Sequence, residues 1–313
     1  KYQSDGVSAE DKALDKFAEL MIEKIESLKN SDSWKQPWFT EGSLRWPRNL
    51  SGREYNGMNA LLLMMLCEKQ NYKLPVFCTF NRAVGLNYTT DKQGAKKPIT
   101  DADGQPLPRV GINKGEKSFP VMLTTFTVVD KDTKEKINYE DYKRLSNDEK
   151  AQYNVYPKLN VYQVFNVDQT NLKEARPDLY AKLESENKLQ RPFSGEGESF
   201  KFPAMDAMIA ENKWICPINL VHQDNAYFSI SKNQITLPEK SQFKDGESFY
   251  GTAFHEMTHS TGTAEMFNRF NPESGFGSAE YAKEELVAEL GSALVAQRYG
   301  MTKNLKDDSA VYM

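Results

Sequence analysis

Two histidines one helical turn apart constrain the fold of this chain more than any other feature. They stand in F-H-E-M-T-H at 254–259, an H-E-x-x-H motif inside an expected helix at 248–262. Because residues i and i+4 share a helix face, His255 and His259 can bind one metal ion together. Glu256 can reach a water beside that ion without being a ligand, and zinc lowers the pKa of such a water to about 7. The motif predicts a zinc hydrolase site with Glu256 as general base; the alternative is an ordinary amphipathic helix.

A third metal ligand is expected from a second helix, at 281–296. Glu285 and Glu289 are four residues apart there and share a face with small residues, which let two helices approach closely. We predict that Glu285 is the third ligand and that Glu289 hydrogen-bonds a ligand imidazole from outside the metal shell. Glu284 and Glu289 are the competing candidates for the ligand, and a solvated acidic face is the alternative for the group.

The residues around both helices resemble a known family. H-E-x-x-H with a downstream glutamate resembles the gluzincin metallopeptidases, although the 25 residues between His259 and Glu285 make a longer interval than in thermolysin. The match runs through Y-G-T-A-F-H-E-M-T-H-S-T-G at 250–262, Arg269, and F-G-S-A-E-Y-A-K-E-E-L-V-A-E-L-G at 276–291. These stretches resemble the zincin-like domain of the ArdC-type antirestriction proteins of conjugative plasmids and transposons. The resemblance implies one Zn²⁺, or another divalent ion, at His255, His259 and Glu285.

The N-terminal half carries an unusual mixture of tryptophan and arginine. Trp34, Trp38 and Trp46 fall within 13 residues and are interleaved with arginines at 45, 48 and 53. Sites for single-stranded nucleic acid use this combination, because aromatic rings stack on any base and cations contact the phosphates. The alternative is that the tryptophans anchor a loop to the core while the arginines keep it solvated.

The same half also resembles the N-terminal domain of ArdC-like proteins, which binds single-stranded DNA. The resemblance rests on W-K-Q-P-W at 34–38, P-R-N-L-S-G-R-E-Y-N-G-M-N at 47–59 and F-N-V-D-Q-T at 165–170. A further turn, G-I-N-K-G-E-K at 111–117, resembles the family's V-R-K-G-E-K-G with Asn113 in place of the arginine. The resemblance implies DNA contacts among Trp34, Trp38, Trp46, Arg48, Asn49, Arg53, Tyr55, Asn59, Lys114 and Lys117.

Composition and charge are those of a soluble two-domain protein. Hydrophobic residues make up 39% of the 313 positions and charged residues 27%, and no apolar run approaches the length of a membrane span. Residues 33–129 hold 13 Lys and Arg against 7 Asp and Glu, whereas residues 130–313 hold 22 against 29. Only the first region therefore suits a polyanion. The three cysteines show no C-x-x-C spacing, and without a visible signal peptide we expect a cytoplasmic protein with reduced thiols.

The expected fold is α+β with two domains. A mixed α/β domain of the single-stranded-DNA-binding type is expected at 1–170, a linker at 171–201, and a zincin-like domain of gluzincin type at 202–313, with a small sheet and the H-E-x-x-H helix. Further helices are expected at 8–30, 59–68, 139–153 and 204–212, and a polar hairpin-like insertion at 85–108. Strands are expected at 75–80, 121–129, 161–167, 218–221, 226–230 and 234–237.

These observations predict a single-stranded-DNA-binding antirestriction protein of a mobile element with a metallopeptidase site. A peptide substrate would lie along the edge of the small sheet, and Tyr227, Tyr250 and Tyr281 are equal candidates for an oxyanion donor. We expect His222 at the surface or behind the metal ligands. The alternative function is a non-catalytic protein that protects DNA, with a structural or vestigial metal site. A third interpretation makes the N-terminal domain a protein-interaction module.

Overall fold

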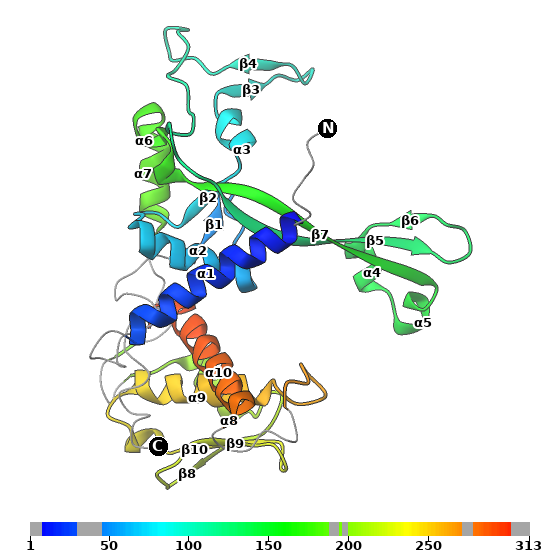
Figure 1. Cartoon of the computed structure of the whole chain (residues 1–313), viewed down its shortest axis with the longest axis vertical. Coiled ribbons are helices and arrows are strands. Elements are labelled where there is room, and N and C mark those ends of the chain that lie inside the picture. The colour runs from blue at the N-terminus through cyan, green and yellow to red at the C-terminus, as the bar shows by residue number, and fades with distance from the viewer. Residues whose placement is uncertain (1–7, 30–45, 188–193, 196–199, 271–277, 302–313) are drawn as a thin grey trace. The chain divides into compact units, whose positions relative to one another are not determined.

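The chain folds into two compact units of mixed helix and sheet, which confirms the predicted α+β class. The computed structural model describes residues 8–29, 46–187, 194–195, 200–270 and 278–301 (Figure 1). The first unit comprises Lys1–Glu23, Arg48–Leu62 and Val76–Leu183, and the second comprises Lys24–Pro47, Leu63–Pro75 and Glu184–Met313. Trp34 and Trp38 lie outside the described residues. Within the described part of the chain, no helix has the length and apolar composition needed to cross a bilayer.

A five-stranded sheet in the order β1-β2-β7-β5-β6 forms the centre of the first unit. Its strands are β1 (Arg48–Asn49), β2 (Val76–Cys78), β5 (Phe119–Asp130), β6 (Lys136–Ile137) and β7 (Tyr153–Asn166). Only the pairing of β1 with β2 is parallel, and β5 and β7 pair from Phe119↔Val164 to Asp130↔Tyr153. Valine, threonine and aromatic residues dominate β5 and β7, as expected for long strands. In Figure 1 these two strands continue as a pair towards α4, α5 and β6.

The described helices of the N-terminal half range from four residues in α5 to 21 in α1. They are α1 (Ala9–Lys29), α2 (Gly57–Gln70), α3 (Phe80–Gly85), α4 (Tyr139–Arg144), α5 (Asn147–Lys150), α6 (Leu172–Ala175) and α7 (Pro177–Glu186), with a 3₁₀ turn, η1, at Val167–Gln169. A short hairpin of β3 (Tyr88–Thr90) and β4 (Lys96–Pro98) occupies the predicted insertion. The predicted helices at 8–30 and 59–68 are confirmed.

Four boundaries predicted for this half are wrong. The segment 172–186 of the predicted linker folds as α6 and α7, because Leu172, Tyr180 and Leu183 are buried in the first unit. The helical insert ends at residue 150 rather than 153, and β7 begins eight residues before the predicted strand. Pairing with β5 explains that difference, since it extends the strand through Pro157 and Lys158, residue types that do not favour strands by themselves. The predicted strand at 75–80 also ends early, where α3 begins at Phe80.

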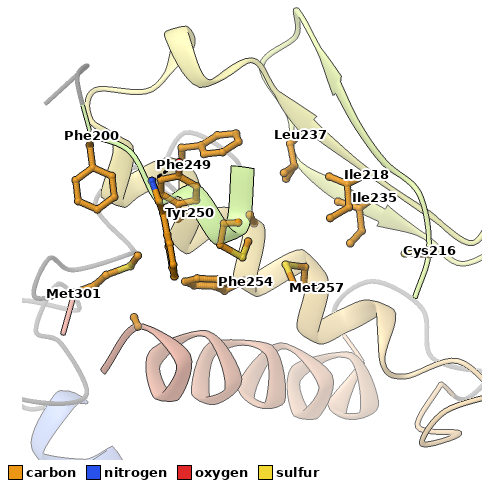
Figure 2. Close-up of a cluster of buried hydrophobic side chains, with 14 residues drawn as sticks. Phe200, Cys216, Ile218, Ile235, Leu237, Phe249, Tyr250, Phe254, Met257 and Met301 are labelled. Carbon is orange, nitrogen blue, oxygen red and sulfur yellow. Dashed lines mark hydrogen bonds between the residues drawn. The ribbon is translucent and has the colours of Figure 1, made fainter. Parts of the chain in front are cut away.

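The second unit packs a small sheet against the helix that carries the histidines. The sheet has the order β8 (Ile218–Val221), β10 (Gln234–Pro238), β9 (Tyr227–Ser229), and β10 runs parallel to β8 and antiparallel to β9. Helices α8 (Pro203–Ala210), α9 (Gly246–Ser260) and α10 (Ala279–Arg298) agree with prediction to within two residues at each end. Figure 2 shows Ile235 and Leu237 of β10 facing the apolar side of α9, where Phe254 and Met257 are buried.

Candidate metal centre

Helix α9 is fixed by an N-terminal cap and by one face that is buried in the core, which leaves another face for the two histidines. Asp245 caps it, its carboxylate accepting hydrogen bonds from the Ser248 backbone and hydroxyl at 2.9 Å each. Phe249, Ala253 and Met257 recur at intervals of four residues and are buried in the core. The remaining face carries His255 and His259, both partly buried, and it faces α10. Helix periodicity alone therefore places both imidazoles on one side.

Three side chains converge on one point between α9 and α10. The Nε2 atoms of His255 and His259 are 3.1 Å apart, and the carboxylate oxygens of Glu285 lie 3.5 Å from each of them. All three ligand atoms fall within 4.8 Å of one another. Ligand atoms around a tetrahedral ion bound at about 2.0–2.1 Å lie roughly 3.3 Å apart. The distances and the two-nitrogen, one-oxygen donor set therefore fit zinc or a similar divalent ion.

Close approach of the two helices makes this convergence geometrically feasible. A Cβ atom built on Gly291 of α10 would lie 2.6 Å from Cγ2 of Thr258 and 2.7 Å from its Oγ1. Ala288 and Ser292, on either side of that glycine, are also buried. Of the small residues expected on this face, Ser292 and Ala296 are buried, whereas Ala282 is exposed. A short glutamate side chain spans the remaining gap between the helices.

Neighbouring glutamates of α10 reach different atoms of the histidines. Glu285 faces both Nε2 atoms, whereas Oε1 of Glu284 lies 3.3 Å from Nδ1 of His259. Oε1 of Glu289 is 3.9 Å from Nδ1 of His255, which is too long for a direct hydrogen bond. Glu289 was predicted to hydrogen-bond a ligand imidazole, but the geometry of Glu284 suits that role better. The sequence analysis had named Glu284 only as a competing metal ligand.

Arg269 fixes the carboxylate of Glu284 and was not predicted to have a role. Its Nε and Nη2 atoms donate to the two carboxylate oxygens at 2.9 Å each, and Nη2 also donates to the Thr258 carbonyl. Burial raises the pKa of Glu284, but hydrogen bonds from His259 and Arg269 outweigh it and lower that pKa to about 2. The sequence signals for this role were the position of Arg269 between the two helices and its place in the family resemblance.

Glu256 and Glu285 occupy different electrostatic environments, as separate roles would require. Burial raises the pKa of Glu256, which has only 7% of its surface exposed, although both histidines oppose that shift. The backbone N–H of Phe228 in β9 donates to the Glu256 carboxylate. A hydrogen bond from His255, assisted by one from Tyr281, lowers the pKa of Glu285 against the effect of burial. A raised pKa suits a carboxylate that accepts a proton, and a lowered pKa suits a carboxylate that stays charged as a metal ligand.

The three candidate tyrosines differ in their surroundings and in the groups that their hydroxyls contact. Tyr281 hydrogen-bonds Glu285 at the centre, whereas Tyr250 is fully buried and its hydroxyl donates to Asp206. Tyr227 is exposed on the edge strand β9. His222 is exposed, as predicted, and its Nδ1 lies 3.6 Å from Glu239. Of the three tyrosines, the structure brings Tyr281 to the candidate metal centre.

Several residues predicted to contact DNA shape the first unit. The side-chain oxygen of Asn49 accepts hydrogen bonds from the backbone of Ser51 and Arg53, which closes a tight loop that presents Arg53 to solvent. The side chain of Asn59 pairs with both backbone groups of Met122, at 2.6 and 2.8 Å. The remaining candidates are half-buried at Trp46, Arg48 and Tyr55, and exposed at Lys114 and Lys117.

The F-N-V-D-Q-T motif locks the basic turn that carries those two lysines. Asn166 and Gln169 form a reciprocal cap around η1. The Gln169 amide then donates to the Glu116 carboxylate and to the Lys117 carbonyl at 2.9 Å each. Two motifs that are about 50 residues apart in the sequence are therefore one structural unit, which orders the backbone on which Lys114 and Lys117 stand.

Comparison with known proteins gives matches over both halves of the chain. A family model described as the N-terminal domain of anti-restriction factor ArdC matches residues 11–165, and one described as a zincin-like metallopeptidase matches 203–313. Two relatives, both DNA primases TraC from Escherichia coli, are 30% identical over 295 residues and 25% identical over 290. The alignments cover 91% and 92% of this chain but 17% and 23% of those proteins, so the chain spans less than a quarter of either.

Two solved structures share the fold. They are the metal-free and Mn(II)-bound structures of the antirestriction ArdC protein from plasmid R388, each 22% identical to this chain. The TM-scores are 0.56 and 0.57, and each match covers 95% of this chain and 85% of the other. The arrangement of elements is therefore one already seen in a protein that has been crystallised with a divalent ion.

Proposed function

The chain is an ArdC-like antirestriction protein with a zincin-like metallopeptidase domain, and from this premise we propose that it binds single-stranded DNA and hydrolyses peptide bonds at a divalent-metal centre. The observation that carries the hydrolytic part is the convergence of His255, His259 and Glu285, with their ligand atoms within 4.8 Å. Buried Glu256 lies on the same helix, one residue after the first of these ligands.

Each side chain of the centre has a distinct task. His255, His259 and Glu285 would hold the ion, zinc being the first choice for this donor set. The bound ion would supply Lewis-acid polarisation and lower the pKa of a water. Glu256 accepts the proton of the attacking water and passes it to the leaving amine, a transfer that its raised pKa favours near neutral pH. Tyr281 holds the carboxylate of Glu285 in place.

The edge strand β9 supports a peptide as substrate. Among the residues that the structure describes, β9 pairs only with β10, so its other edge offers backbone groups to an extended chain. The Phe228 N–H within this strand donates to Glu256, which ties the edge directly to the proposed general base. A peptide that pairs with β9 would therefore pass close to the carboxylate of Glu256.

DNA binding is supported by charge and by the exposed cations of the first unit. Residues 33–129 have an excess of six positive charges, 13 against 7. Arg53, Lys114 and Lys117 are exposed on loops whose backbones are held by hydrogen bonds. We expect oligonucleotide affinity to fall steeply as salt rises, because phosphate contacts release counterions. Affinity that is absent or insensitive to salt would favour the protein-interaction module.

Substitution of the proposed general base tests the hydrolytic function. Glu256→Gln should keep the metal but reduce cleavage of a denatured, fluorescently labelled protein by about 10²–10⁴-fold, the usual contribution of a general base. Glu280→Gln, an exposed glutamate of α10, is the matched control. His255→Ala should in addition lower the metal content. If Glu256→Gln cleaves as fast as the wild type, Glu256 is not the base. If the wild type cuts nothing but still protects single-stranded DNA, the binding-module alternative is correct.

A further inference from the structure

The middle of the β5–β7 pair is a two-stranded ribbon with large apolar side chains in solvent. One end is anchored by buried Val121 and Val164, and the other by buried Val128. Between them the exposed fractions reach 55% for Tyr156 and 44% for Tyr162. A two-stranded ribbon is marginally stable by itself, and large exposed apolar groups that lie together commonly mark a binding surface. The ribbon is therefore a candidate binding surface.

Strand register assigns these side chains to one face. Residues at alternate positions share a face, and so do residues directly opposite each other in an antiparallel pair. Leu123 pairs with Asn160, and Thr125 pairs with Lys158. We call this surface the ribbon face; it consists of Leu123, Thr125, Tyr156, Lys158, Asn160 and Tyr162. The opposite face is partly covered, since Phe126 stacks on Tyr139 of α4 with 4.2 Å between ring centroids.

The charge of the ribbon is unusual for this chain. Residues 119–129 and 154–166 contain no Asp or Glu and a single charged residue, Lys158, although the chain as a whole has 44 Asp and Glu. A polyanion would therefore meet no like charge along these two stretches. Lys158 lies on the ribbon face midway between Tyr156 and Asn160, where it can reach a backbone that passes over the ribbon.

The two tyrosines are placed as stacking platforms. They are six residues apart on one strand and one face, which is about 20 Å at ~3.4 Å per residue. Asn160, between them, is oriented by hydrogen bonds from its Nδ2 to the Thr125 hydroxyl and the Lys158 carbonyl, at 2.9 and 3.1 Å. Aromatic rings in line along a sheet, with a cation and amides between them, suit the bases and phosphates of a single strand.

We propose that the ribbon face binds single-stranded DNA, with Tyr156 and Tyr162 each stacking a base and Lys158 contacting the phosphates between them. This inference rests on the proposed DNA-binding function and extends it, because it adds a site on β5 and β7 beyond the loops that carry Arg53 and Lys114. Residues 119–129 and 154–166 have no acidic side chain to repel phosphates, and their one charged residue, Lys158, is positive, which favours a polyanion as the occupant.

The test is the affinity of the full chain for a fluorescent oligothymidylate, measured by anisotropy at several salt concentrations. Tyr156→Ala and Tyr162→Ala should each weaken binding by roughly fivefold or more, as expected for one lost stacked base. The corresponding Tyr→Phe changes keep the ring and should retain affinity. Lys158→Ala should weaken binding and make the slope of log affinity against log salt shallower by about 1. Leu159→Ala, on the opposite face of the same strand, is the control.

The outcomes separate this inference from the function it extends. If the wild type binds the oligonucleotide and Tyr156→Ala/Tyr162→Ala binds it equally well, the ribbon face is not the site and DNA binding stands. If the wild type binds no oligonucleotide at any salt concentration, the DNA-binding function itself fails. If the double variant keeps its DNA affinity but loses self-association in light scattering, the ribbon face is a protein interface and the proposal is overturned.

Discussion

Glu284→Gln should weaken divalent-ion binding although Glu284 does not face the two Nε2 atoms that would hold the ion. In the native protein its carboxylate accepts from Nδ1 of His259 and is itself held by Arg269. That pair of contacts fixes the ring so that Nε2, the other nitrogen, faces Glu285. The glutamine has the same shape but no charge, so His259 loses its fixed tautomer and part of its basicity.

The structure sets the size of this effect. The pKa of Glu284 falls from 4.5 to about 2, and each pKa unit corresponds to about 1.4 kcal/mol. The difference, about 3 kcal/mol, is an upper limit for all partners of the carboxylate together, since solvent screens the site. Loss of a group that orients a metal-bound histidine typically costs 10–100-fold in affinity, or about 1.4–2.7 kcal/mol. The two magnitudes agree, so we expect a decrease within that range.

Isothermal titration of the metal-free protein with Zn²⁺ or Mn²⁺ measures the effect directly, without any need for a substrate. Arg269→Lys should give a smaller loss, because lysine keeps the charge but not the paired hydrogen bonds. Glu280→Gln, an exposed glutamate on the same helix, should leave the affinity unchanged. An affinity of Glu284→Gln within twofold of the wild type, in a variant that melts normally, would refute the reasoning.

Three further predictions concern stability. Gly291→Ala should destabilise the fold by about 1–3 kcal/mol in urea titrations, because the added methyl group overlaps the Thr258 side chain; combining it with Thr258→Ala should recover part of the loss, and a neutral single variant would contradict the close helix contact. Asn59→Leu should cost about 1–3 kcal/mol by leaving the N–H and carbonyl of Met122 without their partner; an unchanged unfolding midpoint would show that water replaces it. A chelator should lower the melting temperature of the metal-loaded protein, and added ion should restore it in a concentration-dependent way; a melting temperature indifferent to both would argue against an ion bound in the fold.

The local elements of the second unit could be predicted from the sequence alone. Strands β8, β9 and β10 and helices α8, α9 and α10 lie within two residues of the predicted boundaries, because hydrophobic periodicity and caps act over a few residues of chain. The spacing of His255 and His259 also sufficed to place them on one face, since an α-helix repeats every 3.6 residues. Burial of Ser292 on the face towards α9 was expected from the sequence, whereas the closest contact, at Gly291, was not singled out.

Tertiary structure decided everything that depends on the rotation of one element against another. Glu284 and Glu285 are adjacent in the sequence, yet about 100° of helical rotation separates them, so one faces Nδ1 of His259 and the other Nε2. The same holds for the tyrosine at the centre, which is Tyr281 rather than Tyr250. The extra length of β7 depends on pairing with β5, which no local pattern encodes. Short-range periodicity specifies which residues share a face, whereas packing between elements specifies what that face meets.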